Sequence, residues 1–333
     1  VVAVDDGWWR DEVGDTSVRT EILTDRTKRL ITTNQSPDIP FSQSINAYKG
    51  CEHGCIYCFA RPTHAYLDLS PGIDFETKIF KKTNVAELLR KELGKPGYEC
   101  STIAMGTNTD PYQPAEKTHG VTRAALEVLR ECKHPVSIVT KSAMILRDLD
   151  ILADMAAEGL VSANVSVTTL DVELKTKLEP RTAGPRARLK TIRALREAGV
   201  PTGAMLAPVI PFVNDHEIED IVAACRDAGA MSINYILLRL PLEVGPLFEE
   251  WLSTHYPLKH ERVMAAIRDT RGGRAYRARW HERMRGRGPV AELIDQRFQA
   301  ALARAGLKGT ELPRLRCDAF VPPTSDDRQL SLF

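Results

Sequence analysis

Short apolar runs alternate with helical patterns between residues 41 and 240, and this alternation limits the folds open to the chain. The strand-like runs are 43–48, 101–107, 135–141, 161–169, 201–210 and 232–240. Amphipathic helical patterns lie between them. Apolar strands that alternate with helices are typical of parallel βαβ units. The sequence therefore predicts an α/β protein with six strands in a parallel arrangement.

Three cysteines stand close together in the stretch SINAYKGCEHGCIYCFARP, residues 44–62. Cys51, Cys55 and Cys58 have the spacing CxxxCxxC. Three thiolates on one short loop can ligate three irons of a four-iron cluster and leave the fourth iron without a protein ligand. An open iron can bind a reactant, so the spacing favours a cluster that takes part in chemistry.

Two other interpretations of the cysteines remain open. One is a zinc site with His53 or His64 as the fourth ligand. A closed zinc knuckle usually pairs such a loop with a second CxxC or HxxxH, and the sequence contains neither. The other interpretation is three thiols that bind no metal. Gly50 and Gly54 favour the cluster, because glycine suits a loop that must curl around a bulky cubane.

With Phe59 directly after the last cysteine, the loop resembles that of the radical S-adenosylmethionine (SAM) superfamily. The resemblance implies a [4Fe-4S] cluster whose open iron chelates SAM, and which splits SAM to a 5'-deoxyadenosyl radical when reduced. It also implies an electron donor such as flavodoxin or ferredoxin. The superfamily's usual fold, an open (β/α)6 partial barrel of the TIM type, fits the six predicted units. Function should then gather at the carboxyl ends of the strands.

Polar side chains follow three of the predicted strands. After the second strand come Thr109 and Asp110, and the Asp110 carboxylate could accept a hydrogen bond from the amino group of SAM. The third strand ends at Lys141, whose ammonium could pair with the SAM carboxylate. The fourth carries Ser166 and Thr168, whose hydroxyls could reach the same ligand or its ribose. Each residue could instead cap a helix or satisfy a loop.

A narrower resemblance covers roughly residues 42–240. The motifs GCEHGCIYCFA, TNTD, VTK, SVTTLD, LEPRTAGPRARL and GAMLAPVIP are similar to those of the spore photoproduct lyase branch, whose members repair thymine-dimer lesions in DNA. By position, the resemblance implies that the three cysteines hold the cluster. It also implies a SAM site lined by Tyr57, Phe59, Thr109, Asp110, Lys141 and Ser166.

One position departs from that branch. In photoproduct lyases a cysteine opens the TNTD region and donates the returning hydrogen atom, whereas this chain has Thr107 there. A threonine O–H is a poor hydrogen-atom donor, so the same radical relay does not follow. Tyr112, on the same loop, is the candidate catalytic substitute. The alternative is that its ring packs over the loop with Pro111 and Pro114.

The patterns divide the chain into four segments. Residues 1–40 are predicted as an N-terminal extension, 41–240 as the barrel, 241–310 as a helical and basic region, and 311–333 as a flexible tail. Seven cysteines are an odd number, and the clustered three are poor disulfide partners for one another, which indicates a reducing cytoplasm. No apolar run reaches the length of a membrane span.

A basic segment, residues 259–288, contains ten Lys or Arg against three Asp or Glu, in a chain whose net charge is +1. Tyr276 and Trp280 stand among these basic residues. Arginines with interleaved aromatics suit phosphate contacts and base stacking, so the segment favours a nucleic-acid partner. The alternative is a solvated surface whose charges pair with acidic neighbours.

The chain ends in QLSLF, after a loose stretch that contains prolines. This sequence resembles the pentapeptide by which bacterial polymerases and repair proteins bind the replicative sliding clamp. The matching residues are Gln329, Leu330, Ser331, Leu332 and Phe333. Short motifs match easily by chance, so an apolar terminus folded back onto the protein is the alternative.

These features together predict a radical SAM enzyme that repairs or modifies a nucleobase lesion in DNA, as a lyase-like enzyme would. Two alternatives remain. The radical could act on RNA or protein instead, or the chain could be a clamp-associated protein whose iron–sulfur cluster senses redox state without catalysis. Release of 5'-deoxyadenosine from SAM would separate an enzyme from a sensor.

Overall fold

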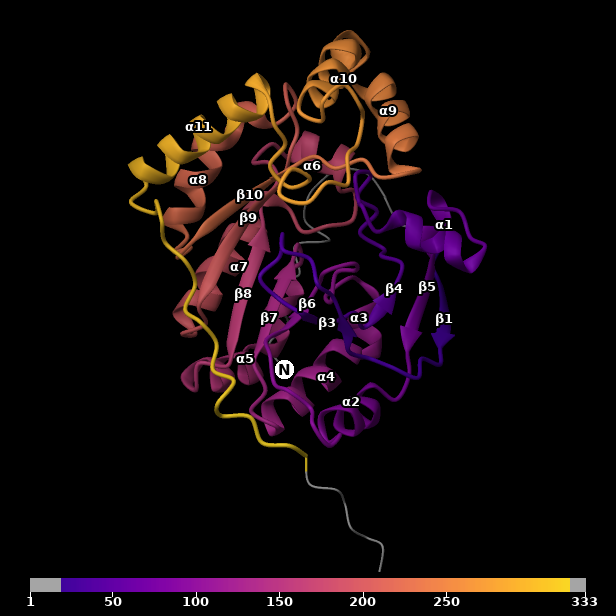
Figure 1. Cartoon of the computed structure of the whole chain (residues 1–333), viewed down its shortest axis with the longest axis vertical. Coiled ribbons are helices and arrows are strands. Elements are labelled where there is room, and N and C mark those ends of the chain that lie inside the picture. The colour runs from indigo at the N-terminus through magenta and orange to yellow at the C-terminus, as the bar shows by residue number, and fades with distance from the viewer. Residues whose placement is uncertain (1–18, 324–333) are drawn as a thin grey trace, which may run out of the picture.

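The structure, a computed structural model, describes residues 19–323, and six parallel strands form the centre of this part of the chain (Figure 1). Neighbouring strands follow the order of the chain, as successive βαβ units do. In this order the strands are β3 (Gln43–Ile45), β6 (Ile103–Met105), β7 (Val136–Thr140), β8 (Val161–Ser166), β9 (Thr202–Val209) and β10 (Ile233–Leu237). This arrangement confirms the predicted α/β fold, a partial TIM-type barrel, although each strand is shorter than the run that predicted it.

Helices connect the strands and cover the sheet. The connecting helices are α2 (Val85–Leu93), α4 (Val121–Glu131), α5 (Leu149–Ala157), α7 (Pro185–Glu197) and α8 (Ile218–Asp227). Apolar residues at three- and four-residue spacing form the buried face of each helix, as Leu126 and Leu129 do in α4. The shorter helices are α1 (Ile73–Thr77), α3 (Ala115–His119) and α6 (Val172–Leu178).

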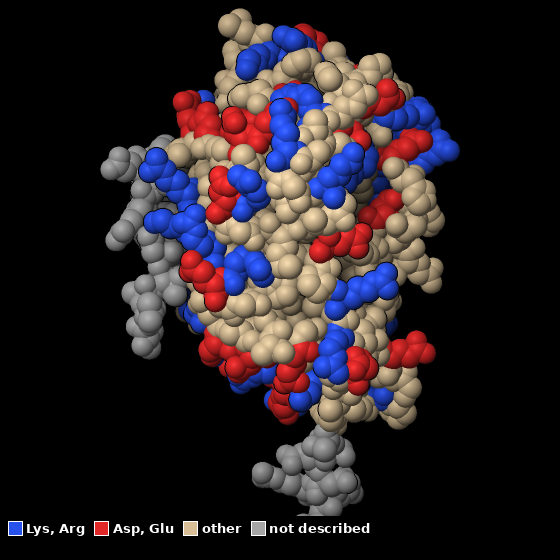
Figure 2. Space-filling model, turned by 90° about the vertical axis from the view of Figure 1, so that its left-hand side faces the viewer, with Lys and Arg blue, Asp and Glu red and all other residues tan. Residues whose placement is uncertain are grey.

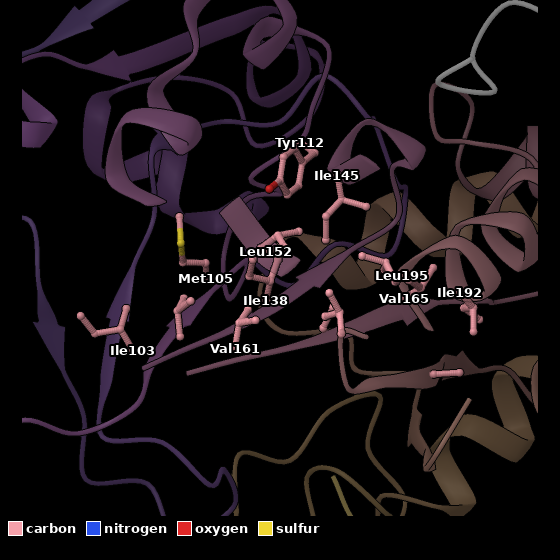
Figure 3. Packing of buried hydrophobic residues seen from close by; sticks show 14 of the residues in the cluster. Ile103, Met105, Tyr112, Ile138, Ile145, Leu152, Val161, Val165, Ile192 and Leu195 are labelled. Carbon is pink, nitrogen blue, oxygen red and sulfur yellow. The ribbon is translucent and has the colours of Figure 1, made fainter. Parts of the chain in front are cut away.

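The hydrophobic core lies between the sheet and these helices (Figure 3). Ile103 of β6, Ile138 of β7 and Val161 of β8 are completely buried, and Leu152 of α5 belongs to the same cluster. Burying a side chain of this size contributes about 1.5–3 kcal/mol. Every residue of β6 is buried, which explains why the strand has a continuous apolar sequence instead of an alternating one.

Residues 19–40, which fall in the predicted N-terminal extension, contribute two strands. The strands outside the central six are β1 (Glu21–Asp25), β2 (Thr32–Thr33), β4 (Tyr48–Lys49) and β5 (Lys78–Lys82). β1 and β4 pair with β5 in a small second sheet, and β2 pairs with β3. Between β1 and β2, the backbone N–H groups of Leu30 and Ile31 donate to the Glu92 carboxylate (2.8 and 2.9 Å). This part of the extension is therefore packed against α2.

Beyond residue 240 the described chain forms helices and then a returning segment. The helices are α9 (Val244–His255), α10 (His260–Asp269) and α11 (Pro289–Arg304). α9 and α10 lie beyond the ends toward which β8 and β9 point, and α11 lies beside α8 (Figure 1). Every helix within residues 19–323 is too short or too polar to reach across a bilayer.

After α11 the chain runs to the amino-terminal edge of the sheet (Figure 1). There the N–H of Arg316 donates to the carbonyl of Gly159 (3.0 Å), and the N–H of Val321 donates to the carbonyl of Cys132 (2.9 Å). These contacts place residues 316–321 against the loops that precede β7 and β8. The predicted clamp-binding residues, 329–333, lie outside the described residues.

Candidate active site

The three cysteines lie on the loop between β4 and the short helix that begins at Arg61. Cys51 and Cys55 are buried and Cys58 is half-buried. The φ angles at Gly50 and Gly54 are 79° and 67°, which side chains rarely adopt. A Cβ at Gly54 would also collide with the guanidinium of Arg181. The loop therefore has the curled backbone that the two glycines predicted.

Side chains from two other segments hold the loop in place. Gln113, in the loop after β6, accepts a hydrogen bond from the Glu52 N–H (2.9 Å) and donates one to the Gly50 carbonyl (3.2 Å). Arg61 donates to the Gly54 carbonyl (3.0 Å) from the other side. Gln113 and Arg61 are almost completely buried, so losing either would leave buried backbone groups without partners. No spacing pattern marks either residue in the sequence.

Glu179, from the motif LEPRTAGPRARL, lies at the centre of a buried polar cluster beside the cysteine loop. Its carboxylate accepts hydrogen bonds from the hydroxyls of Tyr57 and Thr168 and from the guanidinium of Arg188. Burial opposes ionisation of Glu179, but Arg188, Lys141 and the two hydroxyls outweigh it and lower its pKa to about 2. The hydroxyls of Tyr57 and Thr168, both predicted near SAM, are thus bonded to protein.

Asp110 connects three loops at the carboxyl-terminal edge of the sheet. Its carboxylate accepts from the Thr140 hydroxyl (2.6 Å), the Lys141 N–H (2.7 Å) and the Tyr112 N–H (2.9 Å), and lies 3.4 Å from His53 Nδ1. Burial opposes its ionisation, but His53 and these hydrogen bonds outweigh burial and lower its pKa to about 2. The carboxylate therefore has protein partners already, and its contact with SAM stays a prediction.

Lys141 is the predicted SAM residue whose side chain is least engaged with the described part of the chain. The residue is half-buried, and its Nζ lies 5.9 Å from the centre of the Tyr57 ring. Within residues 19–323 its ammonium makes no hydrogen bond or ion pair. Burial disfavours the charge, but Cys55 and Glu179 nearby outweigh burial and raise the pKa of Lys141. A charged ammonium is therefore available to a ligand beside the cysteine loop.

Two further predicted SAM residues are engaged in backbone contacts. The Thr109 hydroxyl donates to the carbonyl of Tyr48 (3.1 Å), which ties the loop after β6 to β4. Ser166, at the end of β8, is almost fully buried, and its carbonyl accepts from Arg188 (3.0 Å). Both residues lie at the edge where they were predicted, and their contact with SAM stays a prediction.

Phe59, the aromatic residue after the last cysteine, is 43% exposed. The guanidinium of Arg239 lies over its ring, 4.7 Å from the centre. Arg239 follows β10, so the last strand of the sheet reaches the cysteine loop through this contact. The predicted position of Phe59 beside the cluster is compatible with this exposure, because a ligand could still reach its ring.

The two residues considered for hydrogen-atom transfer lie in different surroundings. The Thr107 hydroxyl is half-buried and donates to the Asn46 side chain (3.2 Å). The Tyr112 ring is completely buried in the hydrophobic core (Figure 3), and its hydroxyl has no hydrogen-bond partner among residues 19–323. The ring of Tyr112 is therefore packed inside the protein. A catalytic role for Tyr112 stays a prediction.

The basic segment, residues 259–288, contains paired and unpaired arginines. Arg283 forms an ion pair with Asp38 (2.5 Å), and Arg279 forms one with Glu282 (3.2 Å). Arg274 is exposed and Arg277 is half-buried, and neither has a carboxylate partner among residues 19–323. Arg279 and Arg283 therefore fit a solvated surface with paired charges, whereas Arg274 and Arg277 fit a nucleic-acid interface.

The face formed by α8 and α11 has a different charge pattern. Figure 2 shows basic and acidic side chains interspersed over this face. Arg297 pairs there with Glu219 (2.7 Å), and Arg226 pairs with Asp227 (2.6 Å). This face therefore offers no broad basic surface to a polyanion.

The sequence model of the radical SAM superfamily matches residues 45–225, a range that includes the cysteine loop and strands β6 to β9. This chain belongs to the radical SAM superfamily. An uncharacterised protein of Mycobacterium tuberculosis is 41% identical to it over 221 residues, which cover 66% of this chain and 65% of the relative. One from Methanocaldococcus jannaschii is 25% identical over 243 residues, covering 73% and 86%. The chain thus spans about 65% of the length of its mycobacterial relatives.

Solved structures of spore photoproduct lyase have a similar fold. One variant matches with a TM-score of 0.59 at 15% identity, over 89% of this chain and 85% of that one. A second variant, determined with dinucleoside spore photoproduct, matches with a TM-score of 0.51 at 16% identity, over 71% and 65%. At these identities the likeness concerns the fold alone.

Membership of the superfamily implies a [4Fe-4S] cluster and SAM, and the residues of the loop fit a cluster. Three soft thiols on one curled loop are the donor set that such clusters use. A single zinc ion fits less well, because no three His, Cys, Asp or Glu side chains among residues 19–323 converge on one ion. His53 lies against Asp110, and His64 Nε2 bonds the Lys78 carbonyl (3.0 Å).

Proposed function

We propose that this chain is an enzyme that repairs or modifies a nucleobase lesion in DNA by radical chemistry. The reduced cluster and SAM, when bound, would supply a 5'-deoxyadenosyl radical that abstracts a hydrogen atom from the substrate. One observation carries the proposal: at one edge of the sheet, the cysteine loop is contacted by the guanidinium of Arg239 and by the ammonium of Lys141, which has no hydrogen bond or ion pair among residues 19–323. Three thiols beside two cations suit a cluster, a zwitterionic cofactor and an anionic substrate.

The residues of this edge would divide the work among them. Cys51, Cys55 and Cys58 would hold the cluster, and Lys141 would pair with the carboxylate of SAM. The Tyr57 ring, fixed through its hydroxyl by Glu179, would form one wall of the SAM site. Asp110 would act as a positioning residue, because it holds the backbone of Lys141 and the loop after β6 together.

Support for DNA as the substrate comes from the basic segment and from the fold. Spore photoproduct lyase is among the solved structures with a similar fold, and the variant in one of them was determined with dinucleoside spore photoproduct. In this chain Arg274 and Arg277 have no carboxylate partner among the described residues, and Trp280 is 55% exposed and available for stacking on a base. A target base inside a duplex would have to be extruded before the radical could reach it.

The salt dependence of DNA binding tests the role of the basic segment. Neutralising Arg274 and Arg277 together should flatten the log–log slope by about two units, if each contacts a duplex phosphate. Arg279, which pairs with Glu282, is the matched control, and its neutralisation should change the slope less. Unchanged affinity and slope in the double variant would assign the segment to a solvated surface.

The reaction itself is tested by anaerobic incubation of the reconstituted protein with a reductant, deuterium-labelled SAM and damaged DNA. We expect 5'-deoxyadenosine to be released and deuterium transfer between SAM and DNA to be visible by mass spectrometry. Cluster-loaded protein that releases no 5'-deoxyadenosine would favour the redox sensor instead. Deuterium transfer only with RNA or protein would favour those substrates.

We further propose the replicative sliding clamp as a partner, on the sequence QLSLF at residues 329–333. The described segment before it runs along the amino-terminal edge of the sheet, away from the cysteine loop, so a clamp bound beyond this segment could leave the site open. Isothermal titration of the intact chain with clamp should give an affinity near the micromolar range, typical of a short peptide. Deleting residues 329–333 should abolish binding, and no complex at tens of micromolar clamp would contradict the proposal.

Two lesser proposals accompany this function. An electron donor such as flavodoxin or ferredoxin would reduce the cluster, because cleavage of SAM consumes an electron. A cytoplasmic location would suit both the donor and the seven free cysteines. The proposed electron donor is tested by reducing the reconstituted cluster with purified flavodoxin and monitoring the absorbance of the cluster.

A further inference from the structure

Arg239 is a guanidinium with few partners. It lies two residues beyond β10, is half-buried, and has a buried Nε without a hydrogen-bond partner among the described residues. Its one described hydrogen bond runs from Nη1 to the sulfur of Met284 at 3.5 Å, and a thioether is a weak acceptor. A guanidinium has five N–H donors, so most of those of Arg239 have no acceptor among the described residues.

A second guanidinium that has no carboxylate partner among residues 19–323, that of Arg271, is close enough to Arg239 for the two charges to interact. Arg271 is 2% exposed, and its Nη atoms donate to the carbonyls of Leu238 (2.8 Å) and Glu282 (2.9 Å). Its Nε has no partner among the described residues. Burial, followed by the like charge of Arg239, lowers the pKa of Arg271 to about 10, which still leaves it protonated at neutral pH. Two cations are thus held near each other with no carboxylate partner from the described part of the chain.

Other buried arginines of this fold are treated differently. Arg61 pairs with Glu76 (2.5 Å), and Arg188 pairs with Glu179. Where a buried arginine only supports the fold, a carboxylate from the chain neutralises it, because an uncompensated buried charge is costly. Arg239 and Arg271 lack such a carboxylate among residues 19–323, which points to an anion that arrives with a ligand.

The position of Arg239 and Arg271 indicates which ligand brings this anion. Arg239 lies over the exposed ring of Phe59, the residue directly after Cys58, so an anion bound to it would lie beside the cluster loop. Arg271 itself belongs to the basic segment, and Arg274 and Arg277, which have no carboxylate partner among residues 19–323, follow it closely in the chain. The carboxylate of SAM already has a candidate partner in Lys141.

We propose that Arg239 binds a phosphodiester group of the substrate nucleic acid, next to the target base, with Arg271 as a fixed positive charge behind it. The planar fork of a guanidinium matches two phosphate oxygens, which would fix the orientation of the nucleotide as well as its place. This inference rests on the proposed function in one respect, that the substrate is a nucleic acid. It adds Arg239 as the residue that would bind the phosphodiester backbone of the nucleic acid at the reacting nucleotide.

A dinucleotide probe with a single charge tests this assignment. The probes are thymidylyl-thymidine and its neutral methylphosphonate analogue, bound to the cluster-loaded, SAM-bound chain in equilibrium dialysis without reductant. The neutral analogue should bind the parent about tenfold or more weakly, the usual scale for a hydrogen bond to a charged group. Arg239→Gln should bind both probes with the same low affinity, because the interaction that separates them is gone.

Two further variants serve as controls for charge and for position. Arg239→Lys retains the charge and most of the packing but loses the fork, so it should recover only part of the difference between the probes. Arg226→Gln removes an arginine from α8 that pairs with Asp227, and both probes should bind it as they bind the parent. Inorganic phosphate is added as a competitor to separate a phosphodiester site from a site for free phosphate.

Several outcomes would overturn the proposal. The same difference between the probes in the parent and in Arg239→Gln would place the phosphate elsewhere. Displacement of the dinucleotide by equimolar inorganic phosphate would mark a site for the free anion. Loss of SAM affinity in Arg239→Gln, with unchanged dinucleotide affinity, would assign the guanidinium to the carboxylate of SAM. The readout is binding, so failure of SAM cleavage would refute the proposed reaction without touching this assignment.

Discussion

The two edges of the parallel sheet are built in different ways. At the carboxyl-terminal edge, the partly buried Asp110 and the fully buried Glu179 each gather donors from several loops through their carboxylates. At the amino-terminal edge, aromatic rings pack between the returning segment and the sheet. Phe320 lies 5.5 Å from Tyr98 and 5.2 Å from His134, measured between ring centres. One edge is organised by buried charges and their hydrogen bonds, and the other by ring packing with neutral hydrogen bonds of Tyr98 with Gln43 and His134.

This difference shows where the chain accepts an energetic cost. Buried charges are expensive unless they are paired and hydrogen-bonded, and they gain little over apolar packing. Such contacts do, however, fix the direction of each group, which a site for a cofactor needs. The carboxyl-terminal edge also leaves Lys141 and Arg239 without anions among residues 19–323. We therefore expect changes there to affect ligands strongly, and changes at the other edge to affect stability alone.

The largest expected effect is the loss of the cluster. Replacing Cys51, Cys55 or Cys58 with alanine should abolish SAM cleavage, because a site with two thiolates cannot hold the cluster with one open iron. Cys100→Ala, at the amino-terminal edge, is the control and should keep full cleavage. Iron and sulfide content and 5'-deoxyadenosine release measure the outcome. About one zinc per chain without iron or sulfide in anaerobically purified protein would contradict the cluster and its mechanism.

Next in size is the effect of breaking the buried pair of Glu179 and Arg188. Glu179→Ala should lower the free energy of unfolding by about 3–5 kcal/mol, because it leaves a buried guanidinium without its carboxylate. The comparison variant is Tyr98→Phe at the other edge, which removes a hydroxyl hydrogen-bonded to Gln43 and His134 and should cost about 1–2 kcal/mol. Urea unfolding measures both, and equal losses would mean that the two edges do not differ in this way.

A smaller effect is expected on SAM binding. Lys141→Ala removes the proposed partner of the SAM carboxylate and should weaken SAM binding by about 1.5–3 kcal/mol. Lys133→Ala is the matched control, since this exposed lysine pairs with Glu158 at the other edge. Titration of the cluster-loaded protein with SAM measures both affinities. If Lys141→Ala keeps its cluster and binds SAM with parental affinity, Lys141 is not part of the SAM site.

The smallest expected effect is a pH dependence of stability at the amino-terminal edge. Burial lowers the pKa of His134 to about 4. In the unfolded chain the imidazole gains its proton below about pH 6.5, whereas the folded protein resists protonation until about pH 4, so stability falls as pH falls through this window. His134 should contribute a loss of about 2 kcal/mol between pH 7 and pH 5. Urea unfolding of the parent and of His134→Phe at both pH values measures it, and identical pH dependence in the two would contradict it.

Sequence patterns determine much of this protein because they are local. Strand and helix periods identified all six parallel strands, since each period depends on neighbouring residues and on which face of an element is buried. The spacing of three cysteines likewise specifies a shared loop without any knowledge of the rest of the fold. The strands β1, β2 and β5 were missed, because none of them has a continuous buried apolar run and each depends for its stability on a partner strand elsewhere in the chain.

Only the tertiary structure decided which charges are paired. Tyr57 and Glu179 are 122 residues apart in the chain, yet they share a hydrogen bond, so Tyr57 presents its ring to the site instead of its hydroxyl. Asp110 looked open to a ligand in the sequence, whereas its oxygens bond the end of β7. Arg239 carried no signal in the sequence, whereas the fold places it over Phe59 with no carboxylate partner among residues 19–323. Pairing depends on distances between remote segments, and a sequence pattern records only distances along the chain.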